Sequence, residues 1–238
     1  MKTIGIIGGL GPEATIDYYK EIIKGFNAIN NNGSMVYPEI VIFSVNMDKF
    51  IGFLEAEKFT EATNYIADCI NNLGKAGVDF AAISANTPHM LFHEIQKKTT
   101  VPLISIVEAC ALKAKEMGLK KCGLIGTKFT MKSTFFAEVF SRQGVDIVVP
   151  NADQMNLIHE KLFTEMELGI FNDETKIELL TIVNEMKTNT QIDSLILGCT
   201  EFPIMFTENE YLNIPFLNTT KIHVDAIIKT CLNGSSDN

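Results

Sequence analysis

The residues best suited to chemistry lie in a short polar segment around Cys199. Gly198 precedes the thiol, and Thr200 and Glu201 follow it. A glycine lets backbone N–H groups approach an anion, and a threonine supplies a hydroxyl. A thiol with a usual pKa of about 8.5 can both release and take up a proton near neutral pH. This combination favours acid–base catalysis on a small carboxylate. The other four cysteines, at positions 69, 110, 122 and 231, are interpreted as small buried apolar residues.

The Cys199 segment has a counterpart earlier in the chain. Residues 78–89 (VDFAAISANTPH) and 192–203 (IDSLILGCTEFP) both begin with a β-branched residue and Asp, continue as a buried-strand pattern, and end in a polar loop. When the two segments are aligned at the Asp, Ala85 falls on Cys199. The repeat predicts a ligand held between two halves, with a thiol on one side and a methyl group on the other.

These loops need strands and helices to position them, and β-branched runs alternate with helical patterns along the whole chain. Strands are predicted at residues 3–7, 40–45, 80–83, 103–106, 123–125, 146–148 and 194–197. Helices are predicted, from apolar residues spaced three and four apart, at 17–29, 57–74, 90–97, 107–117, 132–143, 155–168, 174–187 and 219–232. The predicted fold class is α/β, with two pseudo-symmetric parallel-sheet domains, flanking helices and a cleft between the domains.

The repeat also predicts the domain boundaries. Residues 5–8 (GIIG) match residues 123–126 (GLIG), so each half begins with a strand and a glycine turn. We expect residues 1–105 together with 209–238 to form the first half and residues 106–208 the second. Ligands of open parallel sheets bind at the carboxyl ends of the strands. The loops expected there are 8–15, 84–89, 126–130 and 198–201.

Composition excludes several classes of protein. The 238 residues carry 20 basic and 29 acidic side chains, a net charge of −9, which argues against a nucleic-acid partner. No apolar run approaches the roughly 18 residues of a membrane span. The five cysteines form no C-x-x-C pair and the four histidines show no ligand spacing, so we expect no metal site and a cytoplasmic location.

Four segments together resemble the aspartate/glutamate racemase family. They are GIIGGLGPEAT at 5–15, ANTPH at 85–89, GTKFTM at 126–131 and GCTE at 198–201, and they span essentially the whole chain. The resemblance implies an isomerase that needs no cofactor, including pyridoxal phosphate. It also implies a small amino-acid or dicarboxylate substrate and a homodimer. In that family two cysteines, one from each half, act on opposite faces of the substrate α-carbon.

The family pattern carries over to this chain with one departure. Cys199 matches the second catalytic thiol, whereas Ala85 stands where the first cysteine belongs and cannot carry a proton. We therefore expect one-sided proton exchange, with water, Ser84 or His89 replacing the missing thiol. The residues that match substrate ligands are Gly9, Leu10, Asn86, Thr87, Thr127, Thr130, Thr200 and Glu201.

Four side chains are weaker candidates for the site. Lys49, His159 and Lys161 are considered as partners of a distal carboxylate, although a solvated helix face is the simpler interpretation for the last two. His89 is considered also as a residue that holds its loop in shape. Glu167 stands near a position where some relatives carry a basic residue, which leaves recognition of a second carboxylate open.

Three alternatives to a racemase remain at this stage. Gly9-x-Gly11-x-x-Ala14 after a strand is typical of dinucleotide binding, but Pro12 lies in the turn and the second strand ends without the acid that binds a ribose. A decarboxylase of malonate derivatives would also use a lone thiol in the second half. A non-catalytic amino-acid-binding protein would keep the carboxylate loops and tolerate Ala85.

Overall fold

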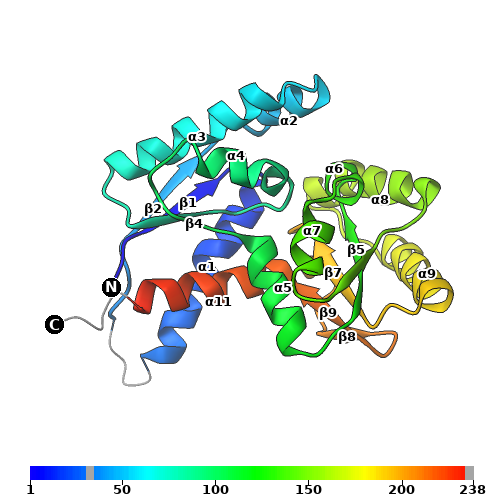
Figure 1. Ribbon diagram of the computed structural model, residues 1–238. Coiled ribbons are helices and arrows are strands. Elements are labelled where there is room, and N and C mark those ends of the chain that lie inside the picture. Colours follow the sequence, from blue (N-terminus) through cyan, green and yellow to red (C-terminus); the bar gives the residue numbers. More distant parts are fainter. Residues whose placement is uncertain (31–34, 234–238) are drawn as a thin grey trace. The chain divides into compact units, whose positions relative to one another are not determined.

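The computed structural model of the chain describes residues 1–30 and 35–233. It divides into two compact units, Met1–Ile106 with His223–Asn238, and Val107–Ile222. Each unit is built on one predominantly parallel sheet with helices packed against it (Figure 1). The predicted α/β class with two parallel-sheet halves is therefore confirmed.

The first unit holds a four-stranded parallel sheet in the order β2-β1-β3-β4. Its strands are β1 (Ile4–Gly8), β2 (Ile40–Ser44), β3 (Phe80–Ile83) and β4 (Leu103–Ile104). Its helices are α1 (Pro12–Ile29), α2 (Met47–Glu55), α3 (Phe59–Lys75), the 3₁₀ helix η1 (Thr87–Leu91), α4 (Phe92–Gln96) and most of α11 (Thr219–Leu232). Figure 1 shows α3 on one face of this sheet and α1 with α11 on the other. Tyr18, Ile22 and Phe26 of α1 pack with Val224 and Ile227 of α11 in the core.

The second unit holds a five-stranded sheet in the order β6-β5-β7-β9-β8, in which only the β8–β9 pair is antiparallel. Its strands are β5 (Lys121–Gly126), β6 (Asp146–Val148), β7 (Ser194–Gly198), β8 (Glu210–Tyr211) and β9 (Ile214–Asn218). Its helices are α5 (Ile106–Glu116), α6 (Lys128–Lys132), α7 (Phe135–Ser141), α8 (Ala152–Thr164), η2 (Met166–Leu168), α9 (Asp173–Thr190) and α10 (Phe202–Met205). Apolar residues of α8 and α9 form one core cluster with β7 and β9.

The structure departs from the predicted elements mainly around β9. The prediction placed residues 209–222 with the first half, whereas Phe216 of β9 pairs in parallel with Leu195 of β7, inside the second unit. Pro215 argues against a central strand because it lacks an N–H group. It precedes the paired stretch, which begins at Phe216, so no bond to β7 is lost. The short helices α2 and α6 were also not predicted, and α7 is shorter than the helix predicted at 132–143.

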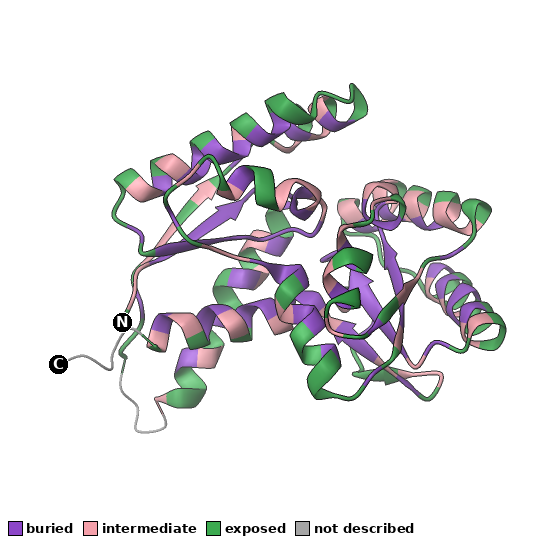
Figure 2. Cartoon of the chain, viewed as in Figure 1, coloured by how far each residue is buried: buried purple, intermediate pink, exposed green. Residues whose placement is uncertain are grey.

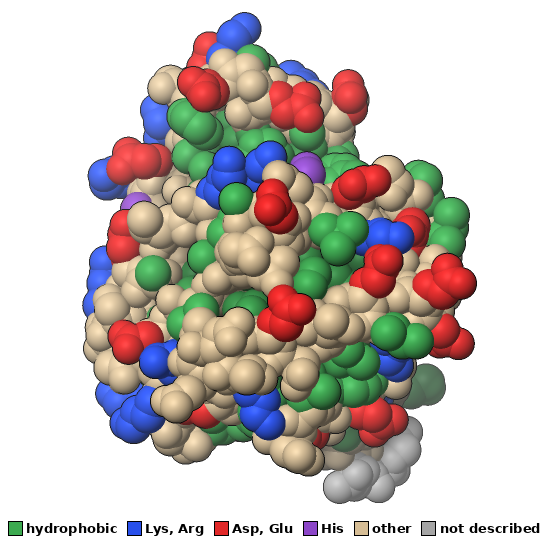
Figure 3. Space-filling view, turned by 90° about the vertical axis from the view of Figure 1, so that its right-hand side faces the viewer, with side chains coloured by type: hydrophobic (Ala, Val, Ile, Leu, Met, Phe, Trp, Pro, Cys, Tyr) green, Lys and Arg blue, Asp and Glu red, His purple; other side chains and the backbone are tan. Residues whose placement is uncertain are grey.

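Burial follows the layers in both units. The central strands are buried throughout, and the helices are buried on one side only (Figure 2). On the face shown in Figure 3, acidic and basic side chains are interspersed. Within residues 1–30 and 35–233, none of the helices has both the length and the apolar character needed to cross a membrane.

Within each unit, parallel strands bring polar loops to one edge of the sheet. In the first unit, β1 and β3 are neighbours and lead into the segments that begin at Gly9 and Ser84. In the second, Gly126 at the end of β5 pairs with Gly198 at the end of β7. The loops that contain Thr127 and Cys199 therefore start side by side.

Candidate active site

Cys199 lies immediately beyond β7, a strand whose five residues are all buried. Gly198 ends this strand, and a Cβ atom added there would lie 2.7 Å from the carbonyl oxygen of Ile125. Only glycine therefore lets β5 and β7 stay this close at their carboxyl ends. Phe202 and Met205 of α10 are buried in the core and fix the other end of the turn. The thiol is held between two anchored elements.

Glu201 is the direct partner of the thiol. The Cys199 Sγ donates to Glu201 Oε2 over 2.8 Å, and the Thr200 hydroxyl lies 3.0 Å from each oxygen of the same carboxylate. All three residues are buried, with exposed fractions of 8%, 7% and 4% for Cys199, Thr200 and Glu201. A buried carboxylate needs such donors because it has lost its hydration. The arrangement gives a continuous path for a proton between sulfur and carboxylate.

The surroundings of Cys199 favour the protonated thiol. Burial raises its pKa well above the usual value, and the nearby carboxylates of Glu201 and Glu167 raise it further. The thiol is therefore a proton donor at rest. To act as a base, it must pass its proton to Glu201 or gain a positively charged neighbour.

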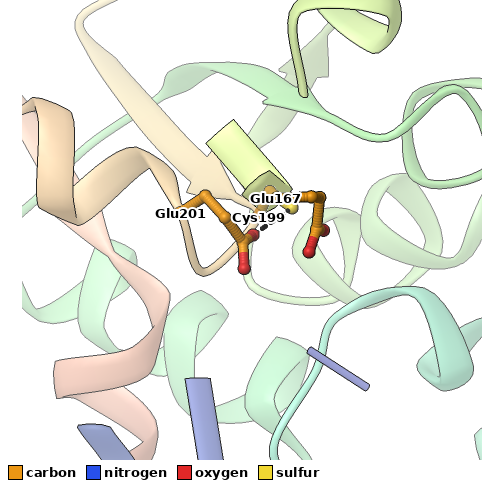
Figure 4. A group of neighbouring side chains, drawn as sticks. All are labelled: Glu167, Cys199 and Glu201. Carbon is orange, nitrogen blue, oxygen red and sulfur yellow. Dashed lines mark hydrogen bonds between the residues drawn. The ribbon is translucent and has the colours of Figure 1, made fainter. Parts of the chain in front are cut away.

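Glu167, at which the sequence left recognition of a second carboxylate open, lies beside Cys199. One oxygen of its carboxylate, the Cys199 sulfur and a Glu201 oxygen all lie within 4.8 Å of one another. Figure 4 shows the two glutamates on either side of Cys199, Glu167 coming from η2 and Glu201 from the turn after β7. Burial, and then the charge of Glu201, raise the pKa of Glu167 to about 7. The sequence signal at this position was the family pattern, in which some relatives carry a basic residue near the position of Glu167.

The threonines after β5 line the same edge of the second unit. Thr127 caps α6, its Oγ1 accepting from the backbone N–H of Thr130 over 3.2 Å. The two hydroxyls are also 3.2 Å apart, and both residues are buried. Two hydroxyls and the first turn of a helix form a group that can hold a carboxylate.

Lys161 and His159 are engaged within the second unit. Lys161 Nζ lies 2.9 Å from Glu165 and 3.3 Å from Glu178, and hydrogen bonds to these acids raise its pKa. His159 Nδ1 accepts from the backbone N–H of Lys128 over 3.4 Å. Lys161 thus links α8 to the segment before η2 and to α9. This geometry favours a structural role for Lys161 over contact with a substrate carboxylate.

The loop after β1 in the first unit is held by Thr15. Gly9 has a φ of +82°, and its N–H donates to Thr15 Oγ1 over 2.9 Å. A Cβ atom at Gly9 would lie 2.4 Å from the carbonyl oxygen of Val45, so the position requires glycine on two grounds. Leu10, the neighbouring predicted ligand, is buried.

The loop after β3 contains Ala85, Asn86 and Thr87, and His89 holds it. Ala85 and Asn86 are buried, and Thr87 begins η1. The backbone N–H of Ile106 donates to His89 Nε2 over 3.2 Å, which places the ring proton on Nδ1. Nδ1 then donates to the Ala85 carbonyl oxygen over 2.9 Å.

The two protein groups suggested as substitutes for the missing thiol are therefore already engaged. Both ring nitrogens of His89 bond to backbone, and burial lowers its pKa to about 3. Ser84 is fully buried and its hydroxyl donates to the Ile7 carbonyl oxygen over 3.1 Å. The geometry favours a loop-positioning role for His89. Of the three groups considered in place of a thiol at Ala85, water is the one that these contacts leave available.

Lys49 lies on the exposed side of α2. Its Nζ is 4.5 Å from the centre of the Tyr65 ring and 6.0 Å from that of Phe53. These are cation–π distances. Lys49 therefore packs against α3 and its own helix.

Comparison with known proteins assigns the chain to a family. Residues 7–227 match the Asp/Glu/hydantoin racemase family. The chain belongs to this family. The four loops that carry the resemblance, 8–15, 84–89, 126–130 and 198–201, begin at the carboxyl ends of β1, β3, β5 and β7.

Individual relatives of this racemase-family chain cover nearly its whole length. The broad specificity amino-acid racemase RacX of Bacillus subtilis (strain 168) is 26% identical over 240 residues, which cover 96% of this chain and 98% of RacX. The structure of PH1733, an aspartate racemase homologue from Pyrococcus horikoshii OT3, is 30% identical, with a TM-score of 0.79 over 98% of this chain and all of that one. The Picrophilus torridus aspartate racemase shares the fold, with 23% identity and a TM-score of 0.75 over 97% of this chain and 94% of its own.

The cluster at Cys199 also bears on metal binding. Over the part of the chain that is described, Glu167, Cys199 and Glu201 form the group whose ligand atoms could surround an ion. A thiolate with two carboxylates is a donor set that zinc accepts. Glu167 is far from the other two residues along the chain, so no ligand spacing predicts this group, and the absence of a metal site stays a prediction.

Proposed function

We propose that this racemase-family protein exchanges the α-proton of a free amino acid through Cys199, without pyridoxal phosphate. Aspartate and glutamate are the first substrates to test. The observation that carries the proposal is the buried hydrogen bond from Cys199 to Glu201 at the end of β7, where the thiol has a partner for its proton. The relationship to RacX and to PH1733 supports amino-acid chemistry over other reactions of a lone thiol.

The proposed reaction takes place on one face of the substrate. The Sγ proton of Cys199 moves first to Glu201 Oε2, and the thiolate then takes the α-proton, leaving the bonding electron pair on the α-carbon as a carbanion. The new Sγ–H exchanges with solvent through Glu201 and protonates the carbanion on the same face, and the thiolate left behind recovers a proton from Glu201. Thr127 and Thr130, with Asn86 and Thr87, are proposed to hold the α-carboxylate and the charge that develops on it. The hydroxyl of Thr200, predicted as a further ligand, donates its one proton to Glu201. That loops of both units contact one substrate molecule stays a prediction from the sequence.

The missing thiol at Ala85 defines the second part of the proposal. A methyl group cannot donate a proton, so inversion requires water on that face, and exchange without inversion should dominate. Proton exchange in D₂O, followed by ¹H NMR for each enantiomer of aspartate and glutamate and then of the other amino acids, tests this. We expect exchange that is lost in Cys199→Ser and retained in Cys69→Ala, a buried cysteine of α3.

Two results would favour one of the alternative functions over amino-acid exchange. Release of carbon dioxide from a disubstituted malonate, without exchange of any amino acid, would favour the decarboxylase. Tight amino-acid binding that neither exchanges the α-proton nor weakens in Cys199→Ser would favour a binding protein.

A further inference from the structure

Glu167 differs from Glu201 in how its charge is balanced. Glu201 has the Cys199 thiol and the Thr200 hydroxyl against its carboxylate. Among residues 1–30 and 35–233, no hydrogen-bond donor and no cation lies against the Glu167 carboxylate. The groups that act on its charge are Glu201 and Cys199. A partly buried acid in such surroundings lacks a positively charged or donating partner.

The position of Glu167 is fixed by its neighbours. Glu165, two residues earlier, accepts from Lys161, Asn172 and Thr175. Met166 is buried in the core, with 2% of its surface exposed. Gly169 closes η2 with a φ of +77°, its N–H donating to the Met166 carbonyl oxygen over 3.0 Å. These contacts anchor the turn that carries Glu167 beside the thiol.

The distances suit one atom of an amino-acid substrate. Proton transfer requires the α-carbon to come within roughly 3.5 Å of the Cys199 sulfur. The α-nitrogen is about 1.5 Å from that carbon. A Glu167 oxygen lies within 4.8 Å of the sulfur, about the distance expected for the α-nitrogen, so an ammonium group that points toward Glu167 can come within hydrogen-bond distance of this carboxylate.

The charges suit the same atom. The site places two carboxylates beside a thiol that must become a thiolate when it acts as a base. A third negative group of the ligand would be repelled, and a neutral amide would leave the acid pair without a counter-charge. An α-ammonium would offset both carboxylates. It would also lower the pKa of Cys199 and stabilise the α-carbanion through its charge.

We propose that Glu167 receives the substrate α-ammonium and thereby restricts the site to amino acids whose amine is free. The inference rests on the proposed function and specifies its substrate class. Hydantoins, in which the α-nitrogen is an amide, and malonate dianions, which carry no cation, are selected against. Glu167 is a specificity-determining residue that contacts the substrate, whereas Glu201 exchanges the proton of the thiol.

Matched ligands and variants test the role of Glu167. The free amino acids, of both hands, are screened by titration calorimetry, and the tightest is compared with its N-acetyl and deaminated derivatives, for example aspartate with N-acetylaspartate and succinate. The wild type should prefer the free amino acid over both derivatives by at least about tenfold in Kd. Glu167→Gln should lose that preference mainly by weaker binding of the amino acid, and its binding of the deaminated acid should be unchanged or tighter, because one repelling carboxylate is removed. Glu174→Gln, in the exposed first turn of α9, should behave as the wild type.

The other outcomes overturn the inference. The first is that Glu167→Gln keeps the preference for the free amino acid. The second is that the wild type binds free and N-acetyl amino acids equally well. The third is that a hydantoin or a malonate binds although no free amino acid binds at 10 mM, roughly the weakest affinity of interest. Zn²⁺ binding that is lost in Glu167→Gln while amino-acid binding stays intact would assign the residue to a metal ion instead.

Failure of the inference is distinguishable from failure of the proposed function. Glu167-dependent binding of amino acids without α-proton exchange would leave the inference standing and refute the proposed catalysis. Exchange that continues in Glu167→Gln with the wild-type KM and ligand preference would refute the inference and leave the proposed catalysis standing.

Discussion

Cys199 differs from the reactive cysteines that attack substrates as thiolates. Such thiols lie in electropositive surroundings that lower their pKa. Here burial and two carboxylates raise the pKa, so that the thiol holds its proton until a substrate arrives. A thiol of this kind suits proton transfer to carbon better than nucleophilic attack.

The consequence of Ala85 can be tested by restoring the thiol. Ala85→Cys should raise the rate of inversion of the preferred amino acid by at least about 100-fold, because a positioned acid or base contributes roughly 10²–10⁴-fold. Chiral chromatography of the reaction mixture measures the inversion. Ala85→Ser, which adds a hydroxyl of similar size but much higher pKa, is the matched control. A folded Ala85→Cys variant without faster inversion would contradict the predicted equivalence of Ala85 and Cys199.

Glu167 should lower the free energy of unfolding at the pH at which its carboxyl group is ionised. Its pKa rises from 4.5 to about 7 in the folded protein, so folding binds a proton in this range and stability falls as pH increases from about 4.5 to 7. Glutamine cannot ionise. Glu167→Gln should therefore be more stable than the wild type by about 1 kcal/mol at pH 8, allowing for solvent screening, and the gain should vanish near pH 4.5. Urea unfolding at both pH values measures the difference, and a gain independent of pH would refute it.

At the scale of elements, His89 connects the loop after β3 to the start of α5. The His89 ring is stacked on Phe92, with 5.3 Å between the ring centres, and His89→Phe would keep this stacking. The same substitution would leave the Ala85 carbonyl and the Ile106 N–H without partners. Two unsatisfied buried groups should lower the free energy of unfolding by about 2–4 kcal/mol. His93→Gln, at an exposed position of α4, should change it by less than about 0.5 kcal/mol. Chemical denaturation at pH 7.5 compares the three proteins; equal losses in both variants would argue against the anchoring role.

The pairing of β5 and β7 sets the place of the thiol. Gly198→Ala would bring a Cβ atom within 2.7 Å of the Ile125 carbonyl oxygen, and the strands would have to separate. We expect a loss of about 1–3 kcal/mol in stability and a larger loss of α-proton exchange, since Cys199 moves with the strand. Gly52→Ala, inside α2 with open space around it, should instead be neutral or stabilising by up to about 1 kcal/mol. Thermal unfolding and exchange rates of both variants check the prediction, which fails if Gly198→Ala keeps wild-type exchange.

At the scale of the whole molecule, the family pattern makes a prediction about association. The resemblance to racemases predicts a homodimer, which sedimentation velocity should detect as one species of about 53 kDa, twice the 26.4 kDa of one chain. A single species at the monomer mass across micromolar concentrations would refute it. The net charge of −9 predicts no retention on immobilised nucleic acid at physiological salt. The cytoplasmic location likewise stays a prediction.

Much of the fold was accessible from local patterns. The strands that became β1, β3, β5 and β7 are short β-branched or apolar runs between polar loops, and such runs specify buried parallel strands. The end of the chain was harder. Pro215 has no N–H group and so argues against a strand where β9 lies. No local pattern could show that β9 pairs with β7 rather than with the sheet of the first unit. Strand pairing is decided by contacts between distant segments.

The sequence by itself determined the repeated strand–loop units, the thiol at Cys199 and the departure at Ala85, because residue identity alone fixes whether a side chain can carry a proton. Only the tertiary structure decided what state that thiol is in. The pKa of Cys199 depends on burial and on Glu167, which comes from a distant turn. The structure likewise showed that His89, Ser84 and Lys161 already have partners. Charge and solvation act through space, so the chemistry of the site depends on neighbours that lie far apart in the chain.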